Sequence, residues 1–157
     1  MDLSEMIIGL LAQRRLTLAV AESCTGGLLM SELVGAPGCS AVLLEGLCTY
    51  SNESKTRRLG VSVQLLEAHG AVSEEVAIAM AECVARTSGA DIGLSTTGIA
   101  GPGGGTDEKP VGLVYIGIYI NGHTSISKLN LTGTRNEIRR QAVDALLEKV
   151  IYELKKI

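Results

Sequence analysis

A segment near the N-terminus combines a nucleophile with a helix start. Residues 21–27 read Ala-Glu-Ser-Cys-Thr-Gly-Gly and directly follow a short apolar run at residues 16–20. This pattern is typical of a strand that turns into a helix, which places Ser23 near unpaired N–H groups and the positive end of a helix dipole. A hydroxyl nucleophile beside such donors suits acyl transfer, because the donors stabilise the oxyanion that forms. A plain helix-capping role would explain the same serine equally well.

Cys24 is the rival nucleophile, because a thiol is intrinsically more reactive and a helix N-terminus lowers its pKa. Adjacent residues that leave a strand point in different directions, so we expect only one of the two to face a pocket. We favour Ser23 as the nucleophile and Cys24 as a small buried residue. The two histidines are poor candidates for the base, because His69 is expected at a helix end and His123 after an exposed turn.

A lysine is the alternative base. Residues 49–55 leave one predicted strand and enter a helix, so they place Tyr50 and Lys55 at a strand end. Lysine acts as a base when burial or a nearby cation lowers its pKa. Because ligands bind at the carboxyl ends of strands in open α/β sheets, we expect both residues at the same edge as Ser23. A solvated Lys55 and a Tyr50 that packs over the core are the simpler alternatives.

A glycine-rich loop follows a third predicted strand. Residues 98–106 contain five glycines and one proline, a backbone that can approach a ligand closely and turn N–H groups toward an anion. The loop does not match the P-loop or the dinucleotide fingerprint, so alone it indicates only a flexible lid or a wide turn. Arginines 135, 139 and 140 open the last predicted helix and suit a phosphate clamp, with surface solvation as the alternative for at least one of them.

The remaining elements place these segments in one sheet. Asn121-Gly122 is a strong hairpin signal between the last two predicted strands. Because helices alternate with strands before that hairpin, we predict one domain over 1–157, a three-layer α/β/α sandwich with a mixed, mainly parallel sheet and a C-terminal β-hairpin. Helices are predicted over 4–15, 25–34, 52–59, 62–69, 73–87 and 134–155, and strands over 16–21, 41–50, 91–97, 111–120 and 124–131.

Composition argues against several function classes. The 157 residues carry a formal charge of −3 and no basic aromatic cluster, so no nucleic-acid partner is expected. Charges or glycines interrupt every apolar stretch, so no membrane span is expected either. The four cysteines lack metal-ligand spacing, which predicts no metal site and a reduced, cytoplasmic setting.

The three segments together resemble the C-terminal domain of the CinA family (competence- and damage-inducible protein), the nicotinamide-nucleotide amidases. The likeness covers nearly the whole chain and rests on AESCTGG at 21–27, TYSNESK at 49–55 with LGV at 59–61, TGIAGPGGGT at 97–106 and KPVGLVY at 109–115. It implies hydrolysis of the amide of nicotinamide mononucleotide to nicotinic acid mononucleotide and ammonia, without metal or cofactor. Because nothing here corresponds to the additional N-terminal domain of longer CinA proteins, the resemblance is to the stand-alone form. Related domains are often dimers, so a homodimer is expected.

The resemblance also implies roles for single residues. Ser23 would be the nucleophile, and Lys55 and Tyr50 would assist its deprotonation. The residues implied to bind substrate are Thr25, Gly26 and Gly27, whose backbone N–H groups would hold the oxyanion, and Gly101, Gly103, Gly104, Gly105, Thr106 and Arg139, which suit the ribose phosphate. Two alternatives remain: a pyridine-nucleotide-binding module without turnover, and an amidase that acts on another small amide.

Overall fold

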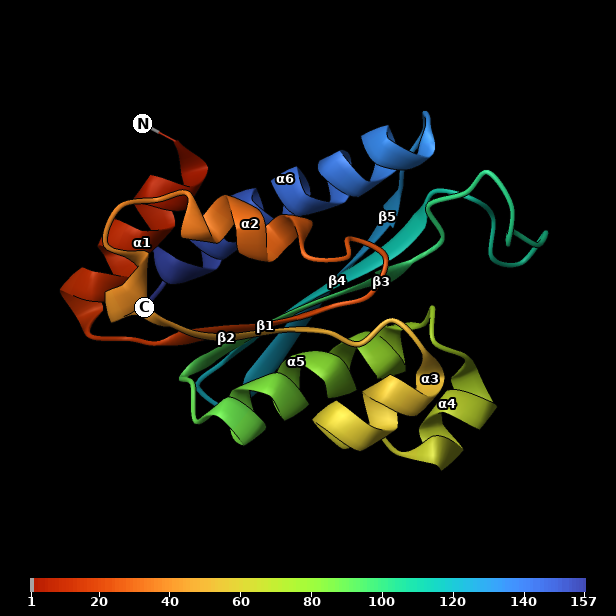
Figure 1. Ribbon diagram of the computed structural model, residues 1–157, viewed down its shortest axis with the longest axis horizontal. Helices are drawn as coiled ribbons and strands as arrows, with labels where there is room; N and C mark the ends of the chain where they lie inside the picture. Colours follow the sequence, from red (N-terminus) through yellow and green to blue (C-terminus); the bar gives the residue numbers. More distant parts are fainter. Residues whose placement is uncertain (1) are drawn as a thin grey trace.

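A computed structural model describes residues 2–157, which form a five-stranded sheet with helices on both faces (Figure 1). The strand order is β2-β1-β3-β4-β5. β1 therefore lies inside the sheet, and all five of its residues are buried. The strands are β1 (Leu18–Glu22), β2 (Leu43–Cys48), β3 (Ile92–Gly98), β4 (Leu113–Ile120) and β5 (His123–Asn130).

The described sheet is mixed, but the prediction that it is mainly parallel is wrong. β1 pairs in parallel with β2 and β3, whereas the β3–β4 and β4–β5 pairs are antiparallel and longer. A parallel neighbour needs a crossover connection, usually a helix. The chain leaves β3 through the glycine-rich loop and re-enters the sheet without a helix, so β4 runs back along β3.

The β4–β5 connection is a two-residue turn. Asn121 and Gly122 both have positive φ, at 52° and 79°, as a type I′ turn requires. The last residue of β4, Ile120, pairs with the first of β5, His123. The strands begin and end within two residues of the predicted bounds.

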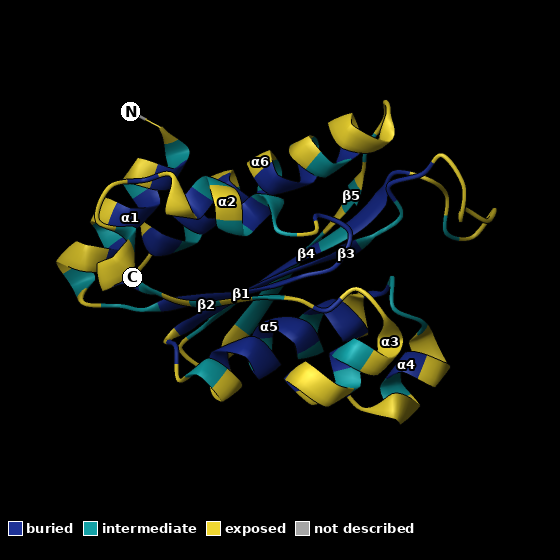
Figure 2. Ribbon diagram, viewed as in Figure 1, coloured by how far each residue is buried: buried dark blue, intermediate teal, exposed yellow. Residues whose placement is uncertain are grey.

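Three helices cover one face of the sheet: α1 (Leu3–Arg14), α2 (Leu28–Val34) and α6 (Arg135–Leu154). Their apolar sides join the sheet in a core that includes Leu11, Leu29 and Leu146. Figure 2 shows these buried sides turned toward the strands. A capping box between Thr134 and Glu137 fixes where α6 begins, and with it the positions of the arginines in its first turns.

The other face is covered by α3 (Asn52–Ser54), the π-helical turn η2 (Lys55–Leu59), α4 (Val63–His69) and α5 (Glu74–Ser88). α5 lies so close to β3 that a Cβ on Gly93 would collide with the carbonyl oxygen of Ala81. A second core holds Leu59 and Val61 against Met80 and β1. This packing holds the turn that carries Lys55 against the sheet.

Three predicted elements differ in detail. α2 begins at Leu28 rather than at residue 25, because Gly26 and Gly27 have φ values of 55° and 96° that no right-handed helix accepts. The helix predicted over 52–59 is α-helical for three residues and then π-helical. The strand predicted over 41–50 is shorter, because a 3-10 turn, η1 (Cys39–Ala41), precedes β2.

The three parallel strands end side by side. Glu22, the last residue of β1, pairs with Cys48 of β2 and with Thr96 of β3. The segments that follow these strands therefore start from one edge of the sheet, as expected for ligand-binding α/β folds. Within the described residues, no helix has the length and the apolar character needed to cross a membrane.

Candidate active site

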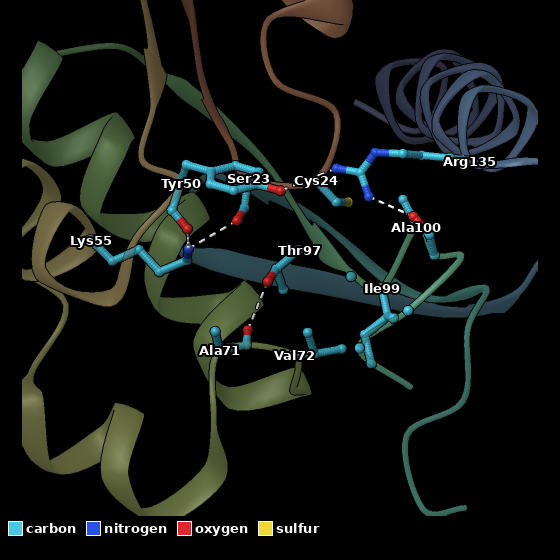
Figure 3. Close-up of a pocket in the computed structure, with 14 residues that line it drawn as sticks. Ser23, Cys24, Tyr50, Lys55, Ala71, Val72, Thr97, Ile99, Ala100 and Arg135 are labelled. Atoms are coloured by element: carbon cyan, nitrogen blue, oxygen red, sulfur yellow. Dashed lines mark hydrogen bonds between the residues drawn. The ribbon is translucent and has the colours of Figure 1, made fainter. Parts of the chain in front are cut away.

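A cavity of about 290 Å³ opens at the carboxyl ends of the parallel strands (Figure 3). The three segments singled out in the sequence meet there, together with the first residue of α6. The lining residues are Ser23, Cys24, Tyr50, Lys55, Ala71, Val72, Thr97, Gly98, Ile99, Ala100, Gly101, Gly103, Gly104 and Arg135.

The centre of the cavity is a serine–lysine pair. Nζ of Lys55 lies 2.9 Å from Oγ of Ser23, 2.8 Å from the carbonyl oxygen of Thr49 and 3.1 Å from that of Tyr50. Lys55 is fully buried, with a relative exposure of 0%. Within residues 2–157 no carboxylate forms an ion pair with it, so this amine is held by neutral oxygens alone.

The partners of Lys55 define what its amine can do. Carbonyl oxygens only accept hydrogen bonds, so Thr49 and Tyr50 each take one N–H of the amine. A neutral amine has two N–H bonds and one lone pair, and the lone pair is then left facing the hydroxyl of Ser23. The same geometry lets a protonated amine donate its third N–H to Oγ. The pair can therefore exchange a proton without moving a heavy atom.

Burial favours the neutral form of the Lys55 amine. Desolvation lowers the pKa of the Lys55 amine from its ordinary value of 10.5 to about 8. A substantial fraction of the amine is therefore neutral just above neutral pH. A base with a pKa near the operating pH is the type that general-base catalysis favours.

Local structure explains why this lysine is buried. Oγ of Ser51 accepts the N–H of Ser54 at 3.1 Å and starts the helix, and the backbone then widens into the π-helical turn that begins at Lys55. Such turns are rare and often occur at functional sites. Leu59 at the end of the turn is buried in the second core, so the turn cannot rotate Lys55 outward without exposing apolar surface.

The turn that carries Ser23 is fixed by buried polar groups. The Ser23 N–H donates to the carbonyl oxygen of Thr96 at 3.0 Å. Thr25 is fully buried, and its hydroxyl bonds to Glu22 at 2.6 Å and to Thr96 at 2.7 Å. Thr25 therefore holds the turn together. Contrary to the expected substrate-binding role, Thr25, Gly26 and Gly27 are not among the cavity-lining residues.

Cys24 also lines the cavity, so the expectation that only one of the two adjacent residues faces it is wrong, but the Cys24 thiol is poorly suited to attack. Burial, with the nearby Glu22 carboxylate adding to it, raises the pKa of the Cys24 thiol to about 11. The thiolate is the nucleophilic form, so almost all of this thiol is inactive at neutral pH. Of the two adjacent candidates, only Ser23 has a base within hydrogen-bond distance.

The three arginines of α6 have separate partners. Arg139 donates to the carbonyl oxygens of Cys24 and Thr25 at 3.1 and 2.8 Å, so it braces the Ser23 turn and is not among the cavity-lining residues. Arg140 pairs with Glu32 at 2.7 Å, outside the cavity. Arg135 lines the cavity instead. Arg135 is the first residue of α6, so the capping box at Thr134 sets its position.

Arg135 joins the glycine-rich loop to Tyr50. Its guanidinium donates to the Gly101 carbonyl oxygen at 2.7 Å and to the Tyr50 hydroxyl at 3.2 Å. The Tyr50 residue is 63% exposed, at the mouth of the cavity, and its contact with Lys55 is made by its backbone carbonyl. The structure thus brings Tyr50 to the site, but its hydroxyl contacts Arg135 rather than Ser23.

The glycine-rich loop divides into two parts. Gly101, Gly103 and Gly104 line the cavity. Farther along, where the loop extends away from the sheet in Figure 1, the Thr106 N–H donates to the Lys109 carbonyl oxygen and the Thr106 hydroxyl accepts the Lys109 N–H. Neither Thr106 nor Gly105 is a lining residue.

Sequence reasoning missed Thr97 and the segment before α5. Thr97 is buried at the end of β3, and its hydroxyl donates to the Ala71 carbonyl oxygen at 2.7 Å, which pins residues 71–72 to the cavity wall (Figure 3). Three consecutive polar residues, 95–97, in an otherwise apolar strand were the available signal. No three His, Cys, Asp or Glu side chains within residues 2–157 are grouped to hold a metal ion.

Residues 1–154 of the chain match the CinA C-terminal domain. The chain belongs to the CinA family. A relative from Clostridium botulinum (strain Langeland / NCTC 10281 / Type F), provisionally named a competence-damage inducible protein, is 56% identical over 154 residues, which are 98% of this chain and 38% of the relative. A CinA-like protein from Kosmotoga olearia is 55% identical over 149 residues, 95% of this chain and 36% of the relative.

Solved CinA structures have the same fold along nearly the entire chain. The competence/damage inducible protein CihA from Agrobacterium tumefaciens is 39% identical, with a TM-score of 0.93 and coverage of 99% of this chain and 96% of that one. A CinA superfamily protein from Klebsiella pneumoniae 700603 is 31% identical, with a TM-score of 0.95 and coverage of 99% and 98%. The chain spans less than two fifths of the length of the Clostridium relative, and the names of these CinA proteins state no reaction.

Proposed function

We propose that this CinA domain hydrolyses the carboxamide of nicotinamide mononucleotide to nicotinic acid mononucleotide and ammonia. The observation that carries the proposal is the 2.9 Å contact between Ser23 Oγ and a buried Lys55 amine whose pKa is lowered to about 8. Serine activated by a neutral lysine is a chemistry for cleaving amides. The substrate is taken from the family resemblance, and the cavity of about 290 Å³ is of a size that suits a mononucleotide.

In the first half of the reaction, Ser23 Oγ bonds to the carboxamide carbon and its proton passes to Lys55 Nζ. The carbonyl oxygen becomes an oxyanion, which backbone N–H groups of the turn after Ser23 stabilise. The Gly26 N–H already donates to the Ser23 carbonyl oxygen at 3.2 Å, and neither Gly26 nor Gly27 lines the cavity. The proposal therefore gives the oxyanion to the N–H groups that directly follow Ser23. When the intermediate collapses, the C–N bond breaks and the leaving nitrogen takes the proton from Lys55.

In the second half, water hydrolyses the ester on Ser23. Lys55 removes a proton from the water as it attacks, and returns that proton to Ser23 Oγ when the ester bond breaks. The products are the carboxylate and a free serine. Thr49 and Tyr50 carbonyl oxygens hold Lys55 through both halves, because their two hydrogen bonds are compatible with either protonation state.

The proposal places the substrate phosphate at Arg135. Arg135 lines the cavity, whereas Arg139 is occupied with the carbonyl oxygens of the Ser23 turn. A planar guanidinium suits a phosphate, and the backbone at Gly103 and Gly104 can approach one closely. The ring of Tyr50, exposed at the cavity mouth, is available to cover the pyridinium.

A substrate panel tests the proposed function. The protein is incubated separately with nicotinamide mononucleotide, nicotinamide riboside and nicotinamide, and released ammonia is measured. We expect the mononucleotide to react fastest, and Lys55→Met to lose at least about a hundredfold in rate. Ammonia release that is fastest from an amide without the ribose phosphate would show that the protein is an amidase for another substrate. Tight binding of the mononucleotide without ammonia release would show that the protein is a nucleotide-binding module without turnover.

A further inference from the structure

A buried glutamate lies directly before the nucleophile, and the mechanism above does not use it. Glu22 ends β1 and is 1% exposed. One of its oxygens accepts the Thr25 hydroxyl at 2.6 Å and the Leu29 N–H at 2.9 Å, and the other accepts the Met30 N–H at 3.1 Å. Among residues 2–157 no cation forms an ion pair with this carboxylate. Burying a charge without a counterion is costly unless hydrogen bonds replace water.

These hydrogen bonds have a fixed direction. The Thr25 hydroxyl has a single hydrogen, which goes to Glu22, so its 2.7 Å contact with Thr96 requires Thr96 to be the donor. The chain of donors runs from Thr96 to Thr25 and ends on the carboxylate of Glu22. The Thr96 hydroxyl oxygen is then left to face the N–H of Ser23, 3.4 Å away.

Both ends of the Ser23 turn are thus tied to one carboxylate. On one side, Glu22 holds the Leu29 and Met30 N–H groups in the first turn of α2. On the other side, it reaches Thr96 through Thr25, and Thr96 receives the Ser23 N–H with its carbonyl oxygen at 3.0 Å and its hydroxyl oxygen at 3.4 Å. Gly26 and Gly27 within the turn have positive φ and are the residue type with the greatest backbone freedom. A turn of this kind keeps one conformation only when its surroundings fix it.

We propose that Glu22 is a positioning residue, whose carboxylate holds the turn in the orientation that points Ser23 Oγ at Lys55. The proposal rests on the proposed function only for the choice of Ser23 as the nucleophile. Glu22 itself does not line the cavity and does not touch the substrate. Its contribution is to keep two reacting groups at hydrogen-bond distance, where a misplacement of about 1 Å costs on the order of a hundredfold in rate.

Substitution of Glu22 by glutamine removes the charge of the side chain and keeps its volume nearly constant. A glutamine has one oxygen, which can keep the Thr25 and Leu29 contacts, but its NH2 group would then face the Met30 N–H, donor against donor. Thr25→Val removes the hydroxyl between Glu22 and Thr96 at nearly constant volume, and Thr25→Ser restores that hydroxyl. Asp91→Asn is the control for loss of a hydrogen-bonded carboxylate away from the cavity, because the exposed Asp91 accepts the Thr17 N–H and hydroxyl, both at 2.8 Å, at the opposite edge of the sheet.

The first measurement is the rate at which a fluorophosphonate labels Ser23, followed by intact mass. Ser23 Oγ bonds to phosphorus, fluoride leaves and Lys55 takes the proton, so no amide substrate is needed. We expect Glu22→Gln and Thr25→Val to label about tenfold to a hundredfold more slowly than the parent, Thr25→Ser to recover part of the loss, and Asp91→Asn to match the parent. With nicotinamide mononucleotide, the loss from Glu22→Gln falls on kcat and leaves KM within about twofold.

The second measurement is the crystal structure of the Glu22→Gln variant. The proposal requires Ser23 Oγ to lie beyond hydrogen-bond distance of Lys55 Nζ, and an unchanged contact overturns it. Equal slowing of labelling in Asp91→Asn and Glu22→Gln also overturns it, because general destabilisation would explain both. If the parent releases no ammonia from nicotinamide mononucleotide but the labelling differences hold, the proposed function fails and the role of Glu22 stands.

Discussion

The amine of Lys55 lies 2.9 Å from the hydroxyl of Ser23, although 32 positions separate the two residues in the chain. They come together because β1 and β2 are parallel neighbours, so the turn after β1 and the helix after β2 start from the same edge. Among residues 2–157, no histidine or carboxylate lines the cavity with them.

The rate should follow the titration of Lys55. Burial lowers the pKa of this amine to about 8, and only the neutral amine accepts the serine proton. We therefore expect kcat/KM to rise about tenfold per pH unit below the midpoint and to level off above about pH 8. The profile is measured from pH 7 upward, because the substrate phosphate titrates near pH 6. A flat profile, or a midpoint near 10.5, would contradict Lys55 as the base.

The same pKa makes stability depend on pH. The folded pKa of about 8 lies below the ordinary value of 10.5, so between these pH values the unfolded chain binds more protons than the folded one. The parent should therefore gain about 2.5 kcal/mol in unfolding free energy relative to Lys55→Met between pH 7 and 10. Denaturant unfolding of both proteins at the two pH values measures the change. A difference that stays constant with pH would show that Lys55 is not desolvated.

Cys24 should prove dispensable for the chemical step. Its thiol pKa of about 11 leaves little thiolate at neutral pH. We expect Cys24→Ala to keep kcat within severalfold of the parent, and to lose on the order of 1 kcal/mol of stability because the side chain is buried. Steady-state kinetics and thermal unfolding of the variant check the two parts. A loss as large as that of Ser23→Ala would make the thiol the nucleophile.

Arg135 should recognise the phosphate of the substrate. Loss of a charge-assisted hydrogen bond costs roughly 1.5–3 kcal/mol, so we expect Arg135→Ala to raise KM for nicotinamide mononucleotide by about tenfold to a hundredfold. The riboside, which lacks the phosphate, should be affected much less. Arg140→Ala is the matched control, since Arg140 pairs with Glu32 away from the cavity. An equal effect of Arg135→Ala on both substrates would show that Arg135 does not bind the phosphate.

The sequence was sufficient to locate the strand ends that carry the site. Apolar runs followed by AESCTGG, TYSNESK and the glycine-rich segment place Ser23, Lys55 and the loop at the carboxyl ends of strands, and the structure brings these three together. The hairpin at Asn121 was equally readable, because two positive φ values restrict the residue types that fit. These features depend on local chemistry, which periodicity and turn residues record.

Features that depend on packing could not be read in the same way. Arg135 and Arg139 lie one helical turn apart, and only the placement of α6 against the Ser23 turn decides which of them lines the cavity. The π-helical turn at Lys55 has no local sequence signal, since tertiary packing of Leu59 holds it. The error about the mainly parallel sheet arose because strand direction after a loop is set by the length and path of that loop.

In the proposed reaction, Ser23 activated by Lys55 cleaves the amide of a pyridine mononucleotide. The most direct test is product analysis with nicotinamide mononucleotide for the parent and the Ser23→Ala variant, at a pH above 8. We expect equal amounts of nicotinic acid mononucleotide and ammonia from the parent, and a rate at least about a thousandfold lower from the variant. Ammonia release by Ser23→Ala at the parent rate would show that Ser23 is not the nucleophile.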